Sequence, residues 1–286
     1  MARVIVVKIG GARAVDPQGA LADVATLVGR GEDVLVVHGG STAVDDALDA
    51  MGSEPEYVET PAGVAGRFTD AETMDVFTMA MGKVNADLVV ALQNEGVSAV
   101  GLSGVDGALL TGPRKSAVKV REGDKTKIRR GDHSGTIEAV NAELLETLLA
   151  GGYTPVVSVP MLGADDAGHD SDDEATEWVA VNADADRAAA AVAGALDARL
   201  VVLTDVAGVY ADPEDPATRF EEVSSPGDLA AVEAAAEGFM TKKVMAATEA
   251  LEDGATDVVV ADATREAPIV AALEGDGTRF TPDAVA

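Results

Sequence analysis

The segment Val4-Ile5-Val6-Val7-Lys8-Ile9-Gly10-Gly11 decides how the chain is interpreted. Its four consecutive apolar residues predict a strand that is covered on both faces, as in a parallel sheet. Lys8 then lies at the carboxyl end of this strand, where open α/β sheets bind ligands, and the glycines let backbone N–H groups approach an anion. The segment indicates phosphoryl chemistry, although a solvated lysine before an ordinary turn also explains it. It contains neither a Walker A loop nor the G-x-G-x-x-G fingerprint of dinucleotide-binding folds.

The composition is that of a cysteine-free chain of 286 residues with 47% hydrophobic content, which is enough for a large core. No stretch approaches the roughly 18 to 20 apolar residues of a membrane span, and the start lacks a signal-peptide pattern. We therefore expect a cytoplasmic protein. Without cysteine there is no disulfide or thiolate metal site, and His38, His133 and His169 are too dispersed in sequence to predict a metal cluster. No metal site is predicted.

The formal net charge of −29, from 50 acidic and 21 basic residues, is unusually negative. Such a charge disfavours nucleic acid as a partner. Because the acidic residues are spread along the chain, they favour a surface adapted to a high-salt cytoplasm, as in a halophile, over a dedicated polyanionic binding surface. Equal stability and activity in dilute buffer and in molar KCl would contradict the halophilic interpretation.

Strand and helix patterns alternate along the chain. Ser41 is a predicted N-cap and Gly52 a predicted C-cap of one helix. The alternation predicts an α/β fold, a three-layer αβα sandwich with a mostly parallel central sheet. Strands are expected at residues 3–8, 34–37, 98–102, 154–159, 199–204 and 256–260, and helices at 17–30, 41–51, 70–95, 138–150, 183–196, 226–235 and 240–253.

Two segments break this alternation. Residues 107–134 alternate polar and apolar side chains around Glu122-Gly123-Asp124, which predicts a long β-hairpin that projects from the sheet. Residues 164–177 form an acidic stretch without apolar periodicity, which we interpret as a solvated loop. Its carboxylates do not have the spacing of an EF-hand calcium loop.

Two turns in the first half carry residues suited to an anionic substrate. His38-Gly39-Gly40-Ser41 leads from a predicted strand into a helix, whose free N–H groups and dipole favour an anion. A tight turn with His38 packed beneath it is the simpler explanation of the same residues. Arg67 precedes the long predicted helix and can bind a carboxylate through two parallel hydrogen bonds, but it also fits a surface position near a helix cap.

Three junctions in the second half also carry polar residues. Asn182-Ala183-Asp184-Ala185-Asp186 places an amide and two carboxylates before a helix, which capping alone would explain. Thr204 and Asp205 follow another predicted strand and are candidates for contact with a nucleotide. Lys242 and Lys243 lie at a helix start, where the dipole disfavours cations unless an anion balances them. This conflict favours a functional role for at least one of the two lysines.

Six motifs resemble the amino acid kinase family in order and spacing over essentially the whole chain. One motif would be weak evidence, whereas six in register are specific. The most similar branches are acetylglutamate kinase and the kinases that phosphorylate glutamate or 2-aminoadipate attached to the small amino-group carrier protein LysW. The motifs are Lys8-Ile9-Gly10-Gly11, His38-Gly39-Gly40, Arg67-Phe68-Thr69-Asp70, Asn182-Ala183-Asp184, Leu203-Thr204-Asp205-Val206-Ala207-Gly208-Val209 and Met240-Thr241-Lys242-Lys243-Val244.

The resemblance implies phosphorylation of a side-chain carboxylate by ATP, and Mg²⁺ is expected from the chemistry of ATP. By it, Lys8 and Lys243 neutralise charge on the transferring phosphoryl group, and Asp184 orients both lysines. These roles suit phosphoryl transfer, which depends on positioning and charge stabilisation, and an ionised carboxylate needs no general base. The resemblance places the amino-acid substrate at Gly39, Gly40, Arg67 and Asn182, and the nucleotide at Gly10, Gly11, Thr204, Asp205, Gly208 and Tyr210.

Two features separate the branches. Acetylglutamate kinases usually carry a further asparagine two positions before the one that matches Asn182. This chain has Ala180 there, so a free acetylated substrate would lose a contact. The second feature is residues 114–130, which gather eight of the 21 basic residues against two acidic ones. The carrier-protein kinases have a similar Arg-Lys-x-Ala-Val-Lys stretch and Arg-Gly-Asp ending, and their carrier is a small acidic protein.

The basic stretch therefore implies a docking surface for the carrier, because complementary charge would guide the carrier to the site and hold it there. At molar salt the Debye length is about 3 Å, so contact pairs would matter more than long-range attraction. A solvated ribbon or a dimer contact is the alternative. The docking residues so predicted are Arg114, Lys115, Lys119, Lys127, Arg129 and Arg130.

The leading prediction is a carrier-protein-dependent glutamate or aminoadipate kinase of arginine or lysine biosynthesis. Acetylglutamate kinase acting on free N-acetylglutamate is the alternative, and a non-catalytic nucleotide or amino-acid sensor is the alternative from another class. The resemblance implies a homodimer of one domain, 1–286, with an amino-acid-substrate lobe at about 1–178 and a nucleotide lobe at about 179–286. Arginine-inhibited acetylglutamate kinases carry an extra N-terminal helix, so feedback inhibition of that kind is not expected.

Overall fold

The structure, a computed structural model, describes residues 4–10, 17–61, 63, 65–123, 125–165 and 176–286. Gly11 and most of the acidic segment 164–177 lie outside these residues, so the predictions made for them are not addressed by the structure. In the described part of the chain, no helix has both the length and the apolar character needed to cross a membrane.

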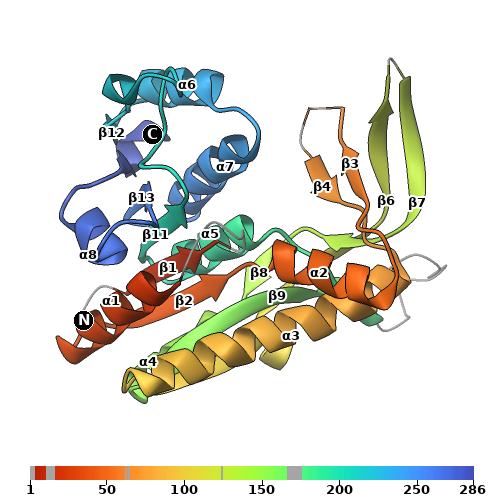
Figure 1. The fold of residues 1–286 in the computed structure, drawn as a ribbon, viewed down its shortest axis with the longest axis horizontal. Helices are drawn as coiled ribbons and strands as arrows, with labels where there is room; N and C mark the ends of the chain where they lie inside the picture. The colour runs from red at the N-terminus through yellow and green to blue at the C-terminus, as the bar shows by residue number, and fades with distance from the viewer. Residues whose placement is uncertain (1–3, 11–16, 62, 64, 124, 166–175) are drawn as a thin grey trace.

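One mixed sheet extends through the molecule (Figure 1). Its strands are β1 (Ile5–Ile9), β2 (Val34–His38), β5 (Ala99–Gly104), β6 (Leu110–Glu122), β7 (Lys125–Gly135), β8 (Ala139–Val140), β9 (Thr154–Ala164), β10 (Trp178–Val181), β11 (Arg199–Thr204), β12 (Glu222–Val223), β13 (Asp257–Asp262) and β14 (Thr278–Phe280). They follow the order β12-β14-β13-β11-β1-β2-β9-β6-β7, with β5 and β10 beside β9 and β8 beside β6. Strands β3 (Tyr57–Glu59) and β4 (Ala65–Arg67) form a separate antiparallel pair.

The centre of the sheet is parallel, as predicted. Strands β13, β11, β1, β2 and β9 pair in parallel along the middle of the sheet. Antiparallel pairs occur at its margins, where β14 joins β13, β10 joins β9, and β6 forms a long hairpin with β7. The hairpin predicted around Glu122-Gly123-Asp124 is therefore confirmed.

Helices cover both faces of the sheet, which confirms the three-layer sandwich. Side chains alternate between faces along β1, so Val6 joins one hydrophobic cluster while Ile5 and Val7 join the other. The first cluster includes residues of α2, α5 and α7, the second includes residues of α1 and α8, and α3 contributes to both. The helices are α1 (Gln18–Gly29), α2 (Ser41–Met51), α3 (Ala71–Asn94), α4 (Ala142–Ala150), α5 (Ala185–Ala195), α6 (Pro226–Ala235), α7 (Phe239–Glu252) and α8 (Pro268–Leu273).

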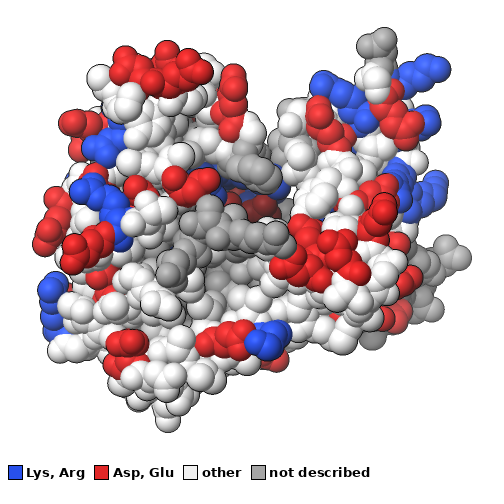
Figure 2. All heavy atoms as spheres, in the orientation of Figure 1, with Lys and Arg blue, Asp and Glu red and all other residues white. Residues whose placement is uncertain are grey.

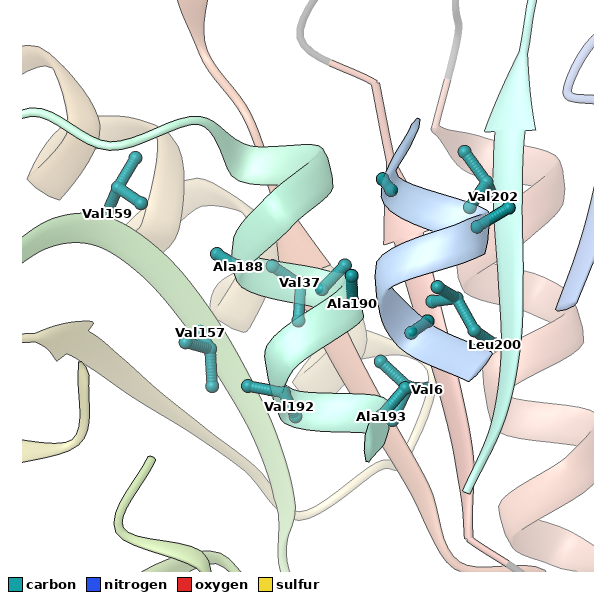
Figure 3. Close-up of a cluster of buried hydrophobic side chains, with 14 of the residues drawn as sticks. Val6, Val37, Val157, Val159, Ala188, Ala190, Val192, Ala193, Leu200 and Val202 are labelled. Atoms are coloured by element: carbon teal, nitrogen blue, oxygen red, sulfur yellow. The ribbon is translucent and has the colours of Figure 1, made fainter. Parts of the chain in front are cut away.

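Helix α5 is rich in alanine because it packs between the sheet and α7. Figure 3 shows Ala193 of α5 beside Val6 of β1, and Ala188 and Ala190 of α5 in the same hydrophobic cluster as Leu200 of β11. All five side chains are fully buried. Small side chains let the helix axis approach its neighbours closely, and the start of α5 is thereby held near the carboxyl end of β1.

Several predicted boundaries needed correction. Gly40, not Ser41, is the residue before α2, and no side chain caps this helix start. Gly52 ends α2 in the left-handed conformation (φ 83°), as predicted. Helix α4 begins at residue 142 instead of 138, because Asn141 caps it by accepting a hydrogen bond from the N–H of Leu144. The short elements β3, β4, β12, β14 and α8 were not predicted.

The molecule has two sides that flank a hollow. Figure 1 shows α6, α7 and α8 on one side, and the β3–β4 pair and the β6–β7 hairpin on the other. Figure 2 shows the surface hollowed between them, with basic atoms exposed in its depth. The lobe boundary near residue 178 stays a prediction, and one sheet continues through both sides because β1 pairs directly with β11.

Candidate active site

Lys8 lies next to the last residue of β1, at the carboxyl end of the strand. It is paired in register with Val37 of β2 and Val202 of β11, so the central strands end around it. Strand alternation turns its side chain to the same face as Val6, toward α5. Only 5% of Lys8 is exposed, which makes it a buried cation that requires a charged partner.

Asp186, in the first turn of α5, is that partner and also pairs with a second lysine. Its Oδ1 lies 2.6 Å from Lys8 Nζ, and its Oδ2 lies 3.4 Å from Lys243 Nζ of α7. Burial raises the pKa of Asp186, but the two ammonium groups outweigh burial and lower this pKa from 3.8 to about 2. One carboxylate thus holds the buried Lys8 and the largely enclosed Lys243, and the group keeps a net positive charge suited to an anion.

Asp184 has a different position from the one predicted. Its Oδ1 accepts hydrogen bonds from the backbone N–H groups of Asp186 (2.9 Å) and Arg187 (3.2 Å), so it is the N-cap of α5. Its Oδ2 lies 3.5 Å from Lys242 Nζ. The carboxylate that orients Lys8 and Lys243 is therefore Asp186, and the prediction of that role for Asp184 was wrong by two positions.

This correction also changes the argument made from Ala180. The prediction took the lysine-orienting aspartate to lie two residues after the substrate-binding asparagine. If Asp186 is the lysine-orienting aspartate, the position two residues before it, which matches the asparagine shared by both branches, is 184. The further asparagine of acetylglutamate kinases, two residues earlier again, then matches Asn182. An asparagine is therefore present where Ala180 had suggested a lost contact, and Ala180 no longer argues against an acetylated substrate.

The N-termini of α5 and α7 converge on this group. Asp186 and Lys243 meet near the helix starts, while a Cβ on Gly194, near the end of α5, would lie 2.5 Å from Cβ of Asp253 after α7. The two helices therefore run in the same direction, and their positive dipole ends favour an anion at one place. The conflict predicted for the lysines at the start of α7 is resolved by the two aspartates of α5.

The second glycine turn connects β2 to α2. A Cβ on Gly40 would lie 2.6 Å from Sδ of Met81, so only glycine fits this close approach without displacement. The Gly39 N–H donates to the carbonyl of Ile9 (3.2 Å), which ties the turn to the end of β1. Gly10, which is described, follows Ile9 and is partly exposed. The turn thus lies directly beside Lys8.

His38 is buried beneath this turn, as the simpler explanation held. Its Nδ1–H donates to the carbonyl of Gly39 (3.1 Å), and its Nε2 accepts from Nδ2 of Asn85 on α3 (3.0 Å). Burial lowers the pKa of His38 from 6.5 to about 4, with the Gly39 hydrogen bond opposing and the charge of Lys8 adding to the decrease. The imidazole is therefore neutral at pH 7 and has a fixed tautomer.

Arg67 is the last residue of β4, and its neighbours were not predicted from the sequence. Its Nη1 pairs with Asp45 Oδ1 at 2.6 Å, and its Nη2 donates to the Tyr57 hydroxyl at 2.9 Å and to the Ser41 carbonyl at 3.1 Å. These contacts fix the guanidinium beside the start of α2. Asn182 contacts Thr69, two residues after Arg67: its Nδ2 donates a hydrogen bond to Thr69 Oγ1 at 3.0 Å.

Four of the residues predicted to contact a nucleotide, from Thr204 to Tyr210, lie at or after the end of β11. Thr204 is buried at the end of the strand, and its hydroxyl donates to Asp205 Oδ1 (3.1 Å). Gly208 has φ 141°, and a Cβ there would lie 2.6 Å from Thr278 Oγ1, so a glycine is required. Tyr210 is partly exposed and forms a β-bridge with Arg219. These residues follow the same strand end, but their contact with a nucleotide stays a prediction.

The predicted docking residues of the hairpin divide into two groups. In the first group, Lys127 forms an ion pair with Glu122, and Arg129 forms one with Glu56. Arg129 also stacks on Phe68, with its Cζ 3.7 Å from the ring centre. Arg114, at the hairpin base, is largely buried against Asp165. The guanidinium of Arg114 already serves this internal contact, and its role as a docking residue stays a prediction.

The other group faces solvent. Register pairs Lys119 with Ile128 and Ala117 with Arg130, so these side chains share one face, opposite to that of Arg129. Ile128 is 66% exposed. In the described part of the chain, no carboxylate lies within ion-pair distance of Lys115, Lys119 or Arg130. We call Lys119, Ile128 and Arg130 the outer face of the hairpin.

Three functional neighbours were missed from the sequence. Asp186 was in the motif as written, but only the geometry separates it from Asp184. Thr69 and Asn85 are ordinary polar residues whose partners lie far away in sequence, so no local pattern could identify them. Among the described residues, no group of three or more histidine, aspartate or glutamate side chains could hold a metal ion. The lysines and helix N-termini that converge here suit an anionic ligand.

Known proteins resemble this chain in both sequence and fold. The amino acid kinase family model matches residues 3–262. A Thermus thermophilus protein named [LysW]-aminoadipate kinase is 41% identical over 96% of this chain and 98% of its own length. A Methanopyrus kandleri protein named acetylglutamate kinase is 39% identical, with coverage of 96% and 98%. In fold, Giardia lamblia carbamate kinase bound to AMP-PNP has a TM-score of 0.69 at 15% identity, with 98% of each chain covered.

Proposed function

The chain belongs to the amino acid kinase family, and from this premise we propose that it phosphorylates glutamate or 2-aminoadipate attached to the LysW carrier protein. The acceptor is the side-chain carboxylate, the donor is ATP, and the product is an acyl phosphate. The observation that carries the proposal is the pair of lysines, buried Lys8 and largely enclosed Lys243, that Asp186 holds where two helix N-termini converge. Relatives named as kinases of LysW-bound substrates support the choice of acceptor.

In the proposed reaction, a carboxylate oxygen of the acceptor attacks the terminal phosphorus of ATP, the bond to the bridging oxygen breaks, and ADP leaves. The acceptor is ionised at neutral pH, so the site needs no general base. Lys8 and Lys243 lie where they can neutralise the charge of the transferring group, and Asp186 keeps them in place. The α5 and α7 N-termini add backbone N–H groups. Mg²⁺ would enter with the ATP phosphates, since they supply the oxygen ligands that it prefers.

Residues on each side of the hollow supply the proposed binding sites. Arg67, Asn182 and the Gly39-Gly40 turn would hold the amino-acid part, and Thr204, Asp205, Gly208 and Tyr210 would lie beside the nucleotide together with Gly10. For Arg67 to bind a substrate carboxylate, its contact with Asp45 must open or be shared. We therefore expect Asp45 to tune the affinity of the substrate site.

The outer face of the hairpin is the proposed docking surface for the acidic carrier. Lys119 and Arg130 are exposed there without a described ion-pair partner, and Ile128 between them offers an apolar contact. Lys115 extends the same basic surface toward the hairpin base. Lys127 and Arg129 contribute less, because their charges are already compensated by glutamates.

Acetylglutamate kinase is the second candidate, favoured by the Methanopyrus relative and by Asn182 at the position discussed above. A non-catalytic sensor is disfavoured, since it would not need two enclosed lysines held by one carboxylate.

The pathway we propose is arginine or lysine biosynthesis in the cytoplasm, where ATP is available. A homodimer is proposed from family resemblance, with exposed Met79 and Val90 of α3 as apolar surface for it, and the charge of −29 supports a halophilic origin.

The deciding experiment measures ADP release with ATP and Mg²⁺ in high-salt buffer. Free N-acetylglutamate is offered in one reaction, and glutamate or 2-aminoadipate attached to the carrier in two others. Turnover confined to the carrier-bound substrates supports the proposal. Turnover of free N-acetylglutamate alone selects acetylglutamate kinase, and ADP release in none of the reactions selects the sensor.

A further inference from the structure

The buried residue Thr69 joins three segments of the site that are far apart in sequence. It lies two residues after Arg67 and is fully buried. Its N–H donates to Asp132 Oδ1 (3.3 Å), its carbonyl accepts from the His133 N–H (2.7 Å), and its hydroxyl oxygen accepts from Asn182 Nδ2 (3.0 Å). Each polar group of Thr69 is therefore used to connect the hairpin base or the segment before α5 to the segment before α3.

These contacts fix Asn182 in both backbone and side chain. Its N–H donates to the carbonyl of His133 (2.8 Å), and its carbonyl accepts from the N–H of Gly135 (2.8 Å). The bond to Thr69 then fixes the amide plane. Because Nδ2 faces Thr69, Oδ1 points away from Thr69, and no described residue donates a hydrogen bond to it. An acceptor with a set direction thus lies two residues before Asp184, at the start of α5.

We propose that Thr69 is a positioning residue, which holds the Asn182 amide so that Oδ1 accepts a hydrogen bond from the substrate's acylated α-nitrogen. The inference rests on the proposed function, because an amino acid attached to a carrier or to an acetyl group through its amino group presents such an N–H. Without the Thr69 hydroxyl, the amide can rotate and present its NH₂ to the N–H of the substrate, which places two donors face to face.

The test is Thr69→Val, which removes the hydroxyl at nearly constant volume. With the acyl substrate that the wild-type enzyme turns over, the KM for this substrate should rise about tenfold while the KM for ATP stays unchanged. Thr69→Ser restores the oxygen and should restore the KM. The matched control is Thr78→Val, because the Thr78 hydroxyl only donates to the Met74 carbonyl within α3 (2.9 Å). If Thr69→Val does not fold, Thr69→Ala replaces it.

A double-mutant cycle separates positioning from general stability. If Thr69 acts through Asn182, adding Thr69→Val to Asn182→Ala should cost less than about twofold. The same tenfold loss in both backgrounds, or an equal rise in both KM values, overturns the inference. A Thr69→Val enzyme with wild-type kinetics overturns the inference alone. A wild-type enzyme that turns over no acyl substrate overturns the proposed function with it.

Discussion

Two groups of basic residues differ in their surroundings: one is enclosed at the candidate active site, and the other is on the solvent-exposed hairpin. Lys8, which is buried near the end of β1, and Lys243, which is largely enclosed in the first turns of α7, share one carboxylate, Asp186. Lys127 and Arg129 lie on the opposite face of the hairpin from Lys119, Ile128 and Arg130, and we call this the inner face. Lys127 is exposed and Arg129 partly exposed, and each forms an ion pair with its own glutamate. The buried group is therefore left with net positive charge where solvent ions screen it weakly, whereas Lys127 and Arg129 are each balanced by a glutamate and reached by solvent. The comparison suggests that burial and shared counter-charge, not the number of basic residues, mark the reactive site.

The largest effect should follow from removing one buried lysine. Lys8→Met keeps the aliphatic part of the side chain but removes the charge that faces the transferring phosphoryl group. We expect kcat to fall at least about 10²- to 10³-fold, the cost typical of losing one preorganised charge-stabilising group. The measurement is ADP release, with circular dichroism to show that the variant folds. Lys127→Met on the hairpin is the matched control, and equal losses from the two substitutions would end the distinction between the groups.

The second prediction concerns the protonation of His38, which would add a positive charge to the buried surroundings of Lys8. The pKa of His38 is lowered from 6.5 to about 4, so below pH 6.5 the unfolded chain binds a proton that the folded chain resists. Stability from this group is complete above pH 6.5 and is lost as the pH falls toward 4, by roughly 3 kcal/mol in total. His38→Gln keeps an acceptor for Asn85, so its unfolding free energy should vary less over this range.

The control for this measurement is His133, which lies at the hairpin base and is less buried. Burial and the charge of Arg114 also lower the pKa of His133, in the same direction as for His38. His133→Gln should change the pH dependence of urea unfolding less than His38→Gln does. A larger change at His133 would show that burial does not control the response.

The two aspartates of α5 provide the third prediction. Asp186→Asn leaves Lys8 and Lys243 without their shared negative charge, so kcat should fall about 10²-fold. Burial and the charge of Lys8 lower the pKa of Lys243 and Asp186 opposes them, so in this variant the alkaline limb of the pH profile should move to lower pH. Asp184→Asn keeps the cap, since asparagine is an equally good N-cap, and should cost less than about tenfold. Equal losses, or a larger loss at Asp184, would reinstate the prediction made from the sequence.

This pair of aspartates illustrates how far sequence reasoning reached. The fold class, the central strands and the hairpin were predictable because period-two and helical patterns are local properties of the chain. The identity of the lysine-orienting carboxylate was not. Asp184 and Asp186 are both compatible with the start of α5, and only the direction in which each side chain leaves the helix decides between a cap and an ion pair.

The hairpin shows the same limit for charge. Its density of basic residues was visible in the sequence, and the expectation that it projects was confirmed. Which cations are compensated depends on Glu56 and Asp165, residues outside the hairpin and far from their partners in sequence. The composition of the hairpin does not reveal ion pairs with residues outside it. The sequence therefore predicted a basic docking surface on the hairpin, but not which of its basic side chains are paired with carboxylates.

The fourth prediction separates these faces. Reversing Lys119 and Arg130 to glutamate should raise the KM for a carrier-bound substrate about tenfold without changing the KM for ATP, because these charges have no described ion-pair partner. Lys127→Glu and Arg129→Glu together should also disturb their glutamate partners, so their effect should include a lower unfolding temperature. The measurement compares KM values and melting curves for both double variants. An unchanged KM after reversal of the outer face would remove it as the docking surface.

The smallest effect is expected for the exposed ion pair between Arg129 and Glu56. Hydrogen bonding to Arg129 lowers the pKa of Glu56, yet both groups are accessible to solvent. A double-mutant cycle with Arg129→Gln and Glu56→Gln, read by urea unfolding, should give a coupling of less than about 1 kcal/mol. The Lys83–Asp87 pair on α3, more exposed and four residues apart, should give about 0.3 to 0.5 kcal/mol.

Salt makes this last measurement decisive for the comparison. In molar KCl the Debye length falls to about 3 Å, so the coupling of both exposed pairs should shrink, while the activity that depends on Lys8, Asp186 and Lys243 should persist because solvent ions reach the buried group less readily. If the Arg129–Glu56 coupling instead stays near its low-salt value, the two direct hydrogen bonds between the guanidinium and the carboxylate, and not screened long-range attraction, would account for it. The contact of Arg129 with Phe68 cancels in such a cycle, so this result would place the pair with the buried group in its response to salt.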